Sequence, residues 1–382
     1  MDPIFTAVST NANHLYTLLR CIGFAPKAAV QITPDGIRFS AEEGRVMQGL
    51  AFLDKALFAN YSFRPPRASE HGGEDGGDQG NENEDDDMIC PQFLISLSAL
   101  LETLQIFGIS DHSSTTDRSG PPSSTAASAF TAPAVLQGRS CTLRYSHLGG
   151  PLSIIISESG VTTTCELTTY DPSDPSFGAS DGGELDIPLQ RDAIVMKIIM
   201  RSALLYNAIT ELDSTEPTVL TISASATKPP FFALSGSGGP FSESTVEFSV
   251  EGKTAPEGNG DNISTRRAGA KLAPTVTETF QVNPPSHRHG RVKERYRFSL
   301  IRKASRAMAA ASKVSIRGDV QGVLSLQFMI ELNDSGSSSS GASGGATGSV
   351  SSRAGMGNVS FVDFRFVPLV DEDGEEDGHD LS

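Results

Sequence analysis

The chain has 382 residues, of which 38% are hydrophobic, which is enough for one large core or two ordinary ones. Its longest apolar runs, 152–156 and 195–200, are far shorter than the roughly 20 residues that cross a bilayer, and its start lacks the features of a signal peptide. The net charge of −16 is concentrated in two segments without Lys or Arg: 68–88 has nine acids and 371–382 has seven. We therefore expect a soluble intracellular protein whose remaining residues are formally neutral and can form a basic surface.

The first half reads as short strands around two helices. Asn11 or Asn13 can cap the opening helix, which Gly23 closes, and Pro34-Asp35-Gly36 is typical of a turn. The apolar face of that helix is formed by Leu15, Leu18, Leu19 and Ile22. The strands are expected at 5–8, 29–32, 37–39, 47–53, 56–63, 93–96, 141–145, 152–157 and 161–168, with a second helix at 97–107.

The second half is predicted to repeat this order. A strand at 186–189 precedes a long helix over 191–212, which is apolar at 194, 195, 198, 199, 205 and 209. Strands follow at 219–224, 231–234, 245–250 and 277–282, residues 296–300 lead into a helix over 301–311, and the last strands are 313–316, 323–332 and 359–367. Strand, helix, four strands, helix and three strands thus occur twice.

Five stretches lack the apolar periodicity that would stabilise an ordered structure. We interpret 171–185 as a connector between a first domain, 1–170, and a second domain, 186–370. The acidic segment 371–382 is a tail that follows the second domain. The disordered inserts are expected at 66–88, 111–138, 252–276 and 334–357.

The duplicated pattern, ending in an acidic tail, resembles the eukaryotic sliding clamp, proliferating cell nuclear antigen. A closer resemblance is to its checkpoint relative, the Rad-one type subunit of the nine-one-one DNA-damage clamp. It covers most of the predicted ordered chain and fails only in the long insertions. The residues that carry it are 100–108 (LLETLQIFG), 211–213 (ELD), 228–232 (KPPFF), 312–317 (SKVSIR) and 322–330 (GVLSLQFMI).

This resemblance implies an α+β, duplicated DNA-clamp fold, in which each domain has antiparallel sheets outside and two helices lining a central hole. It also implies a heterotrimeric ring with two paralogous clamp subunits, joined edge strand to edge strand, that an ATP-dependent clamp loader opens at damaged DNA. Checkpoint and repair proteins would read out the loaded ring in the nucleus. In the family, client peptides dock at the connector, where Pro172, Pro175 and Phe177 are the candidates here.

A clamp that slides needs Lys and Arg facing phosphates without base contacts. On the predicted helix 191–212, Lys197 and Arg201 are four residues apart and share a face, although a solvated helix face would look the same. Arg302, Lys303 and Arg306 form one patch on the last predicted helix. The first domain offers only His14 and Arg20, so we expect an unevenly basic hole.

No pattern predicts a catalytic, cofactor or metal site, and we expect a scaffold that is not an enzyme. One alternative is a 3′ to 5′ exonuclease, which needs several converging carboxylates; an Asp-x-Glu spacing occurs only at Asp373 and Glu375, in the tail. A homotrimeric replication processivity clamp is the other alternative. The four cysteines, at 21, 90, 141 and 165, lack zinc-type spacing and are interpreted as core thiols. The acidic segments either keep the chain soluble or dock basic partners.

Overall fold

The computed structural model describes eight stretches of the chain: 2–66, 90–106, 140–158, 160–172, 186–249, 274–285, 290–332 and 358–370. The predicted inserts and the acidic tail lie outside these residues, apart from short ends at Pro66 and at 274–276. The described chain falls into two compact units. The first comprises Met1–Ala41, Leu50–Glu184 and Leu332–Ser360, and the second comprises Glu42–Gly49, Leu185–Glu331 and Phe361–Ser382.

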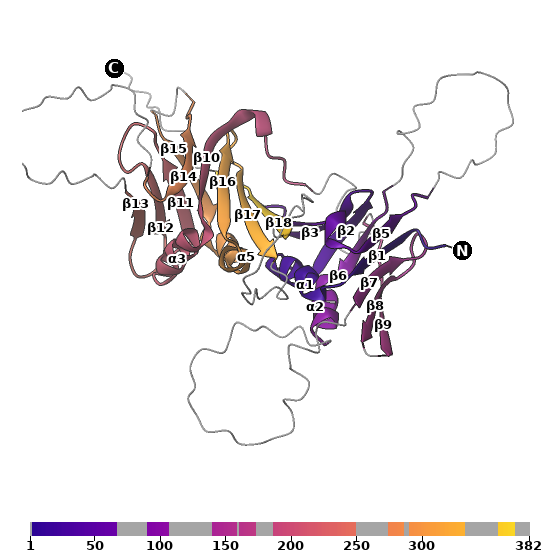
Figure 1. Ribbon diagram of the computed structural model, residues 1–382. Helices are drawn as coiled ribbons and strands as arrows, with labels where there is room; N and C mark the ends of the chain where they lie inside the picture. Colours follow the sequence, from indigo (N-terminus) through magenta and orange to yellow (C-terminus); the bar gives the residue numbers. More distant parts are fainter. Residues whose placement is uncertain are drawn as a thin grey trace, which may run out of the picture. The chain divides into compact units, whose positions relative to one another are not determined.

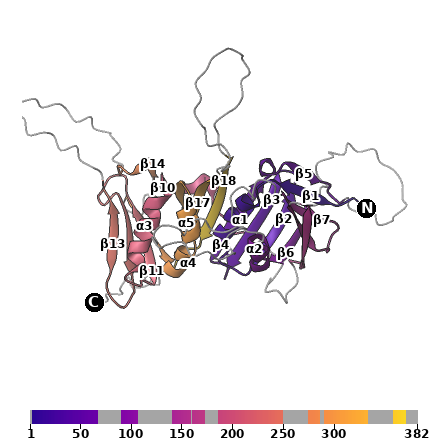
Figure 2. The same ribbon diagram turned by 60° about the horizontal axis from the view of Figure 1, so that its bottom comes forward.

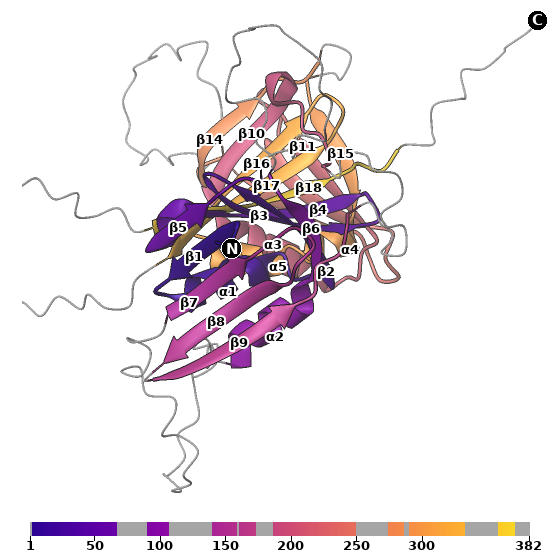
Figure 3. The same ribbon diagram turned by 90° about the vertical axis from the view of Figure 1, so that its right-hand side faces the viewer.

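The first unit has two antiparallel sheets and two helices that lie side by side (Figure 1). One sheet has the order β5-β1-β7-β8-β9, with β7, β8 and β9 adjacent in Figure 3, and the other runs β4-β3-β2-β6. In chain order the elements are β1 (Phe5–Ser9), α1 (Ala12–Cys21), β2 (Lys27–Thr33), β3 (Gly36–Glu43), β4 (Met47–Asp54), β5 (Asn60–Phe63), β6 (Gln92–Ser96), α2 (Leu97–Ile106), β7 (Ser140–Tyr145), β8 (Leu152–Glu158) and β9 (Val161–Leu167).

Local chemistry explains how these elements begin and turn. The side chain of Asn11 accepts a hydrogen bond from the Asn13 amide at 3.1 Å, so Asn11 is the predicted helix cap. The predicted turn joins β2 to β3, which run side by side with β6 (Figure 2). Gly36 is required there because a Cβ atom would lie 2.3 Å from the carbonyl oxygen of Leu53.

The second unit repeats this plan with different strand lengths. Its sheets have the orders β14-β10-β16-β17-β18 and β13-β12-β11-β15, and α3 lies beside α5 (Figure 1). In chain order the elements are the 3-10 turn η4 (Arg191–Ala193), β10 (Ile194–Arg201), α3 (Ser202–Asp213), β11 (Val219–Ala224), β12 (Phe232–Ser237), β13 (Ser244–Phe248), β14 (Thr277–Val282), β15 (Val292–Arg297), α4 (Phe298–Arg302), α5 (Ser305–Ala310), β16 (Lys313–Asp319), β17 (Leu324–Leu332) and β18 (Asn358–Phe366).

The duplicated α+β architecture is confirmed, but the element order needs one correction. Five strands, not four, separate the helices of each unit, because the segments that lead into the second helices are themselves the strands β6 and β15. In both units the helices pack on the buried faces of the sheets. None of the helices within the described stretches is long and apolar enough to cross a membrane.

The predicted helix over 191–212 is wrong in its first half. Residues 194–201 form β10, which pairs with β14 and β16, and only 202–213 are helical. The run Ile-Val-Met-Lys-Ile-Ile-Met-Arg fits a helical stripe, but its branched residues also fit a central strand, and pairing on both sides decides the outcome. The strand predicted at 186–189 is absent from the described structure, since these residues form an irregular segment before β10.

The last predicted helix is also divided. It consists of α4 and α5, and the break falls at Lys303 and Ala304. There the amides of Lys303 and Ala304 donate to the carbonyls of Leu300 and Ile301, three residues back, at 3.1 and 3.0 Å. This tightened turn changes the direction of the chain between the two short helices.

Candidate nucleic-acid interface

The helix pair α3 and α5 presents the main candidate surface of the second unit. Its buried side is apolar, and the hydroxyl of Ser202 at the start of α3 donates to the carbonyl of Met308 in α5 at 2.7 Å. The exposed side of α3 includes Tyr206, Asn207 and Thr210, and the helix contains no Lys or Arg. Any positive charge on this surface must therefore come from α4 and α5.

Arg302, Lys303 and Arg306 supply that charge, and we call them the α4–α5 basic patch. Arg302 ends α4, Lys303 lies in the tightened turn and Arg306 is in α5, so the patch spans two helices. The Nη1 atom of Arg302 lies 3.1 Å from Oδ1 of Asp213, and Lys303 pairs with Glu43. Three cations and two partner carboxylates leave a small local excess of positive charge.

Lys197 and Arg201 are not on a helix, which corrects the prediction that they share a helical face. Both lie on β10, whose alternate residues Met196, Ile198 and Met200 are buried on the side where α3 packs. Side chains alternate across a strand, so Lys197 and Arg201 project from the opposite face of the sheet. This geometry contradicts the expectation that they line the same surface as the helices.

The candidate residues of the first unit also differ from expectation. His14 is only 8% exposed, and its Nε2 atom lies 3.0 Å from the Nδ2 atom of Asn11. Arg20 is half-buried, with its guanidinium 5.9 Å from the centre of the Tyr16 ring. An exposed role for His14 is therefore contradicted, and α2 has Glu102 as its single charged residue. The predicted scarcity of positive charge on the helices of this unit is confirmed for α1 and α2.

The connector is described only at its beginning. Pro172 is half-buried, whereas Pro175 and Phe177 lie outside the described residues. Just before the connector, Tyr170 exchanges two backbone hydrogen bonds with Leu94 of β6, at 2.8 and 2.9 Å. The docking role of the connector stays a prediction.

The structure also reveals a basic stripe on β15 that faces away from the helices. Lys293, Arg295 and Arg297 alternate with the buried Val292 and Tyr296, so they share the outer face of the sheet. We call these three cations the β15 stripe. Alternation of basic residues at a period of two is visible in the sequence and could have identified it.

Arg291, which continues this alternation, has a structural role. Its guanidinium donates to the hydroxyl of Ser223 at 2.9 Å and to the carbonyls of Lys228, Pro229 and Pro230 at 2.9–3.1 Å. Because these neutral acceptors hold all the printed contacts of the side chain, Arg291 fixes the loop between β11 and β12.

Carboxylates and thiols are dispersed in the described stretches. No three His, Cys, Asp or Glu side chains gather there in a way that could hold a metal ion. Asp363 accepts from Ser325 at 2.7 Å and from Arg365 at 3.2 Å. Cys21 and Cys141 are buried as predicted, whereas Cys90 and Cys165 are only partly buried. Burial raises the pKa of the Cys141 thiol to about 12, which keeps it protonated and unreactive. Asp373 and Glu375 lie outside the described residues.

The duplicated architecture and the helix surfaces define the class of protein: the fold is that of the DNA sliding clamp. The crystal structure of proliferating cell nuclear antigen from Thermococcus kodakaraensis has the same fold, with a TM-score of 0.54 and 14% identity, over 96% of this chain and 100% of that one. The model of the family "Repair protein Rad1/Rec1/Rad17" matches residues 4–330. The chain belongs to this family, and the resemblance found in the sequence is confirmed.

Relatives of the chain include checkpoint proteins from fungi and animals. The DNA damage checkpoint control protein rad1 of Schizosaccharomyces pombe is 29% identical over 97% of this chain and 89% of its own length. The human cell cycle checkpoint protein RAD1 is 26% identical over 85% of each chain. The DNA damage checkpoint control protein RAD17 of Saccharomyces cerevisiae is 22% identical over 86% of this chain and 66% of its own length.

Proposed function

We propose that this chain is a non-enzymatic subunit of a heterotrimeric sliding clamp that is loaded around DNA at damage sites and acts as a scaffold for checkpoint signalling and DNA repair. The observation that carries this proposal is the family match over residues 4–330, together with the clamp fold. Its partners would be two paralogous clamp subunits, an ATP-dependent clamp loader, double-stranded DNA bound without sequence preference, and checkpoint and repair proteins. Such work takes place on chromatin, which implies the nucleus.

Two edge strands support assembly into a ring. β9 and β13 end their sheets, and the only charged residue of each is a single glutamate, Glu166 or Glu247. Neither contains Lys or Pro, the residues that commonly protect an edge from pairing, and Val161 at the start of β9 is 66% exposed. The edge at β15 is different, because the amide of Leu369 donates to the carbonyl of Arg295 at 2.7 Å.

Different edges on the two units suit a head-to-tail contact between subunits. Heterologous contacts of this kind close into a ring when the rotation between subunits allows it. In such a ring β9 of one subunit would add to an edge strand of its neighbour, as edge strands do in recognition by strand addition. The α4–α5 basic patch would then face the DNA backbone from the helix surface.

The assembly experiment is size-exclusion chromatography with light scattering on the full chain, alone and after co-expression with two paralogous clamp subunits. We expect a monomer alone and a single three-chain complex with both partners. A stable homotrimer of the chain alone would favour the replication clamp instead. A monomer that ignores both partners would refute the assembly proposal.

The exonuclease alternative lacks support from the described carboxylates, which do not converge. Incubation of the pure chain with end-labelled DNA and Mg²⁺ or Mn²⁺ tests it directly. We expect the DNA to remain intact. Degradation that a single carboxylate substitution abolished would show that the scaffold role is incomplete.

A further inference from the structure

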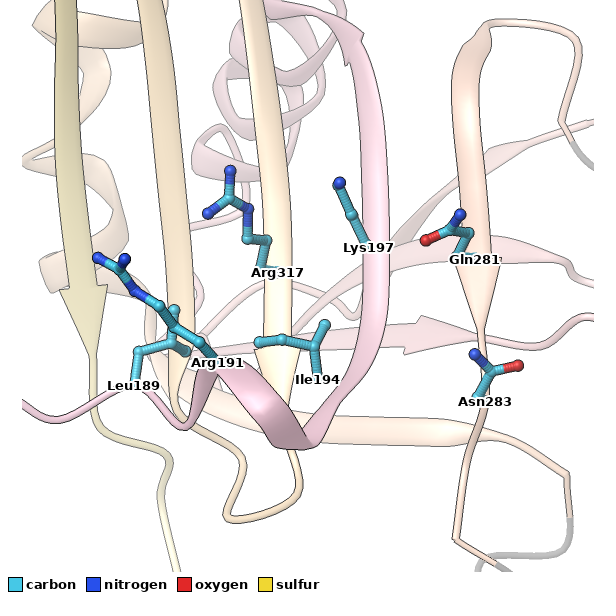
Figure 4. A pocket seen from close by; sticks show the side chains of 7 residues that line it. All are labelled: Leu189, Arg191, Ile194, Lys197, Gln281, Asn283 and Arg317. Carbon is cyan, nitrogen blue, oxygen red and sulfur yellow. The ribbon is translucent and has the colours of Figure 1, made fainter.

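A polar pocket of about 370 Å³ lies on the face of the second unit that carries Lys197, away from α3. It is formed by β10, β14, β16 and the segment that precedes β10 (Figure 4). Its lining contains three cations and two side-chain amides, but no carboxylate. The residues are Leu189, Arg191, Ile194, Lys197, Gln281, Asn283 and Arg317.

The strand register places two of the cations directly opposite each other. Lys197 is paired with Arg317 across β10 and β16, and with Gln281 across β10 and β14. Paired residues share one face of a sheet, and like charges in that position destabilise it. Arg317 is nevertheless held in place: its Nε atom donates to Oγ of Ser315 at 3.1 Å and its Nη2 atom to Oε1 of Gln327 at 2.5 Å.

No neighbouring acid neutralises this cluster within the described residues. Arg191, Lys197 and Arg317 make none of the ion pairs found there, whereas six other cations each pair with a carboxylate. Asp319, the cross-strand partner of Ile194, is buried. Its carboxylate accepts from the backbone amides of residues 190, 321 and 323 at 2.9–3.0 Å. The charge of the pocket is therefore left for an external anion.

The pocket borders an edge strand. β14 is the last strand of its sheet, pairs with β10, and contributes Gln281, while Asn283 follows it. A peptide in extended conformation can add to such an edge through its backbone and place a side chain into an adjoining pocket. From the charge and the edge together, we propose that this pocket binds the phosphate of a phosphoserine or phosphothreonine in an extended peptide that lies along β14.

Phosphate fits this lining better than a carboxylate or a nucleic acid does. A phosphorylated side chain carries close to two negative charges and three acceptor oxygens, which match two guanidinium groups, one ammonium group and two amides. Arginine binds phosphate through paired hydrogen bonds. A DNA backbone would need a continuous basic track, whereas these cations converge on one hollow (Figure 4). The inference goes beyond the proposed clamp role and does not depend on it.

The test measures fluorescence anisotropy of the full chain with labelled random-sequence peptides that carry a central phosphoserine or phosphothreonine. The same peptides with Ser and Thr, or with Asp, are the controls for phosphate. The pocket variant is Lys197→Gln with Arg317→Gln. The matched control, Lys293→Gln with Arg297→Gln, removes the same charge from the β15 stripe on the other sheet of the unit.

We expect the phosphorylated peptides to bind, the unphosphorylated ones to bind at least about tenfold more weakly, and the pocket variant to lose at least about tenfold. The β15 control should bind like the unaltered chain. Arg191→Gln alters an exposed turn residue outside the sheet, so its loss of binding supports the site even if the double variant unfolds. Binding that is independent of phosphate, equal in both double variants, or displaced equally well by a short DNA duplex would overturn the proposal.

Discussion

Replacing Arg302, Lys303 and Arg306 together by Ala should weaken the salt-sensitive DNA association of the assembled clamp. Each phosphate that a cation neutralises contributes about 0.9 to the slope of log affinity against log salt, so three contacts would contribute about 2.7. Two members of the patch are engaged with Asp213 and Glu43, and their carboxylates remain after binding. We therefore expect the slope to fall by between about 1 and about 2.7.

The measurement is the affinity of the three-subunit complex for duplex DNA over a series of salt concentrations. Each lost contact should reduce the gain in affinity from tenfold dilution of salt by about eightfold. The matched control replaces the β15 stripe, Lys293, Arg295 and Arg297, by Ala, which removes the same charge from a face turned away from the helices. Thermal unfolding checks both variants, because exposed ion pairs contribute no more than about 1 kcal/mol each. An unchanged slope in the patch variant, or an equal fall in both variants, would refute the assignment.

Three further outcomes follow from the strands and the core. Of Thr163→Pro and Thr164→Pro in β9, the variant whose lost amide points outward should melt like the unaltered chain yet fail to co-elute with its neighbour, because Pro blocks edge pairing; two assembling variants would contradict the role of this edge. Gln281→Glu should stabilise the fold by about 0.2–1 kcal/mol through its cross-strand partner Lys197, with Gln281→Lys lowering the stability as the control, both by urea unfolding. Because burial raises the pKa of Cys141 from 9.0 to about 12, the folded chain keeps a proton that the unfolded chain releases, so the free energy of unfolding is unaffected below pH 9.0 and declines between these values by at most about 1.4 kcal/mol per pH unit. Cys141→Ala should remove that part of the decline; an identical pH profile for the variant would show that the thiol is not involved.

Much of the fold could be predicted from local patterns, because each had a single consistent interpretation. The cap at Asn11, the turn at Gly36 and the repeated strand-to-helix junctions depend on residues close together in sequence. The segment 194–201 could not be resolved in the same way. Its apolar residues fit a helical stripe and a central strand equally well, and only pairing with residues some 80 and 120 positions away, seen in the register, selects the strand.

The candidate site depended on that ambiguous segment. On a helix, Lys197 would share the surface of the α4–α5 basic patch, whereas on β10 it joins Arg317 in the pocket on the opposite face. Arg317 could not be recognised from the sequence, since its importance comes from register and not from spacing. Arg302 and Lys303 were found from local charge, but their partners Asp213 and Glu43 are distant in sequence, so their partial neutralisation was invisible.

The separation of these two basic surfaces has a thermodynamic consequence. The α4–α5 basic patch belongs to the helix side of the second unit, while Lys197 and Arg317 project from the other side of the sheet on which α3 packs. Sites that share no side chains and are divided by a packed layer contribute nearly additively. A chain altered at both surfaces should therefore lose DNA and phosphopeptide affinity by the sum of the two separate free-energy losses. Coupling beyond the usual error of about 0.5 kcal/mol would mean that the two ligands compete for one surface, and this would contradict the placement of Lys197 away from the helices.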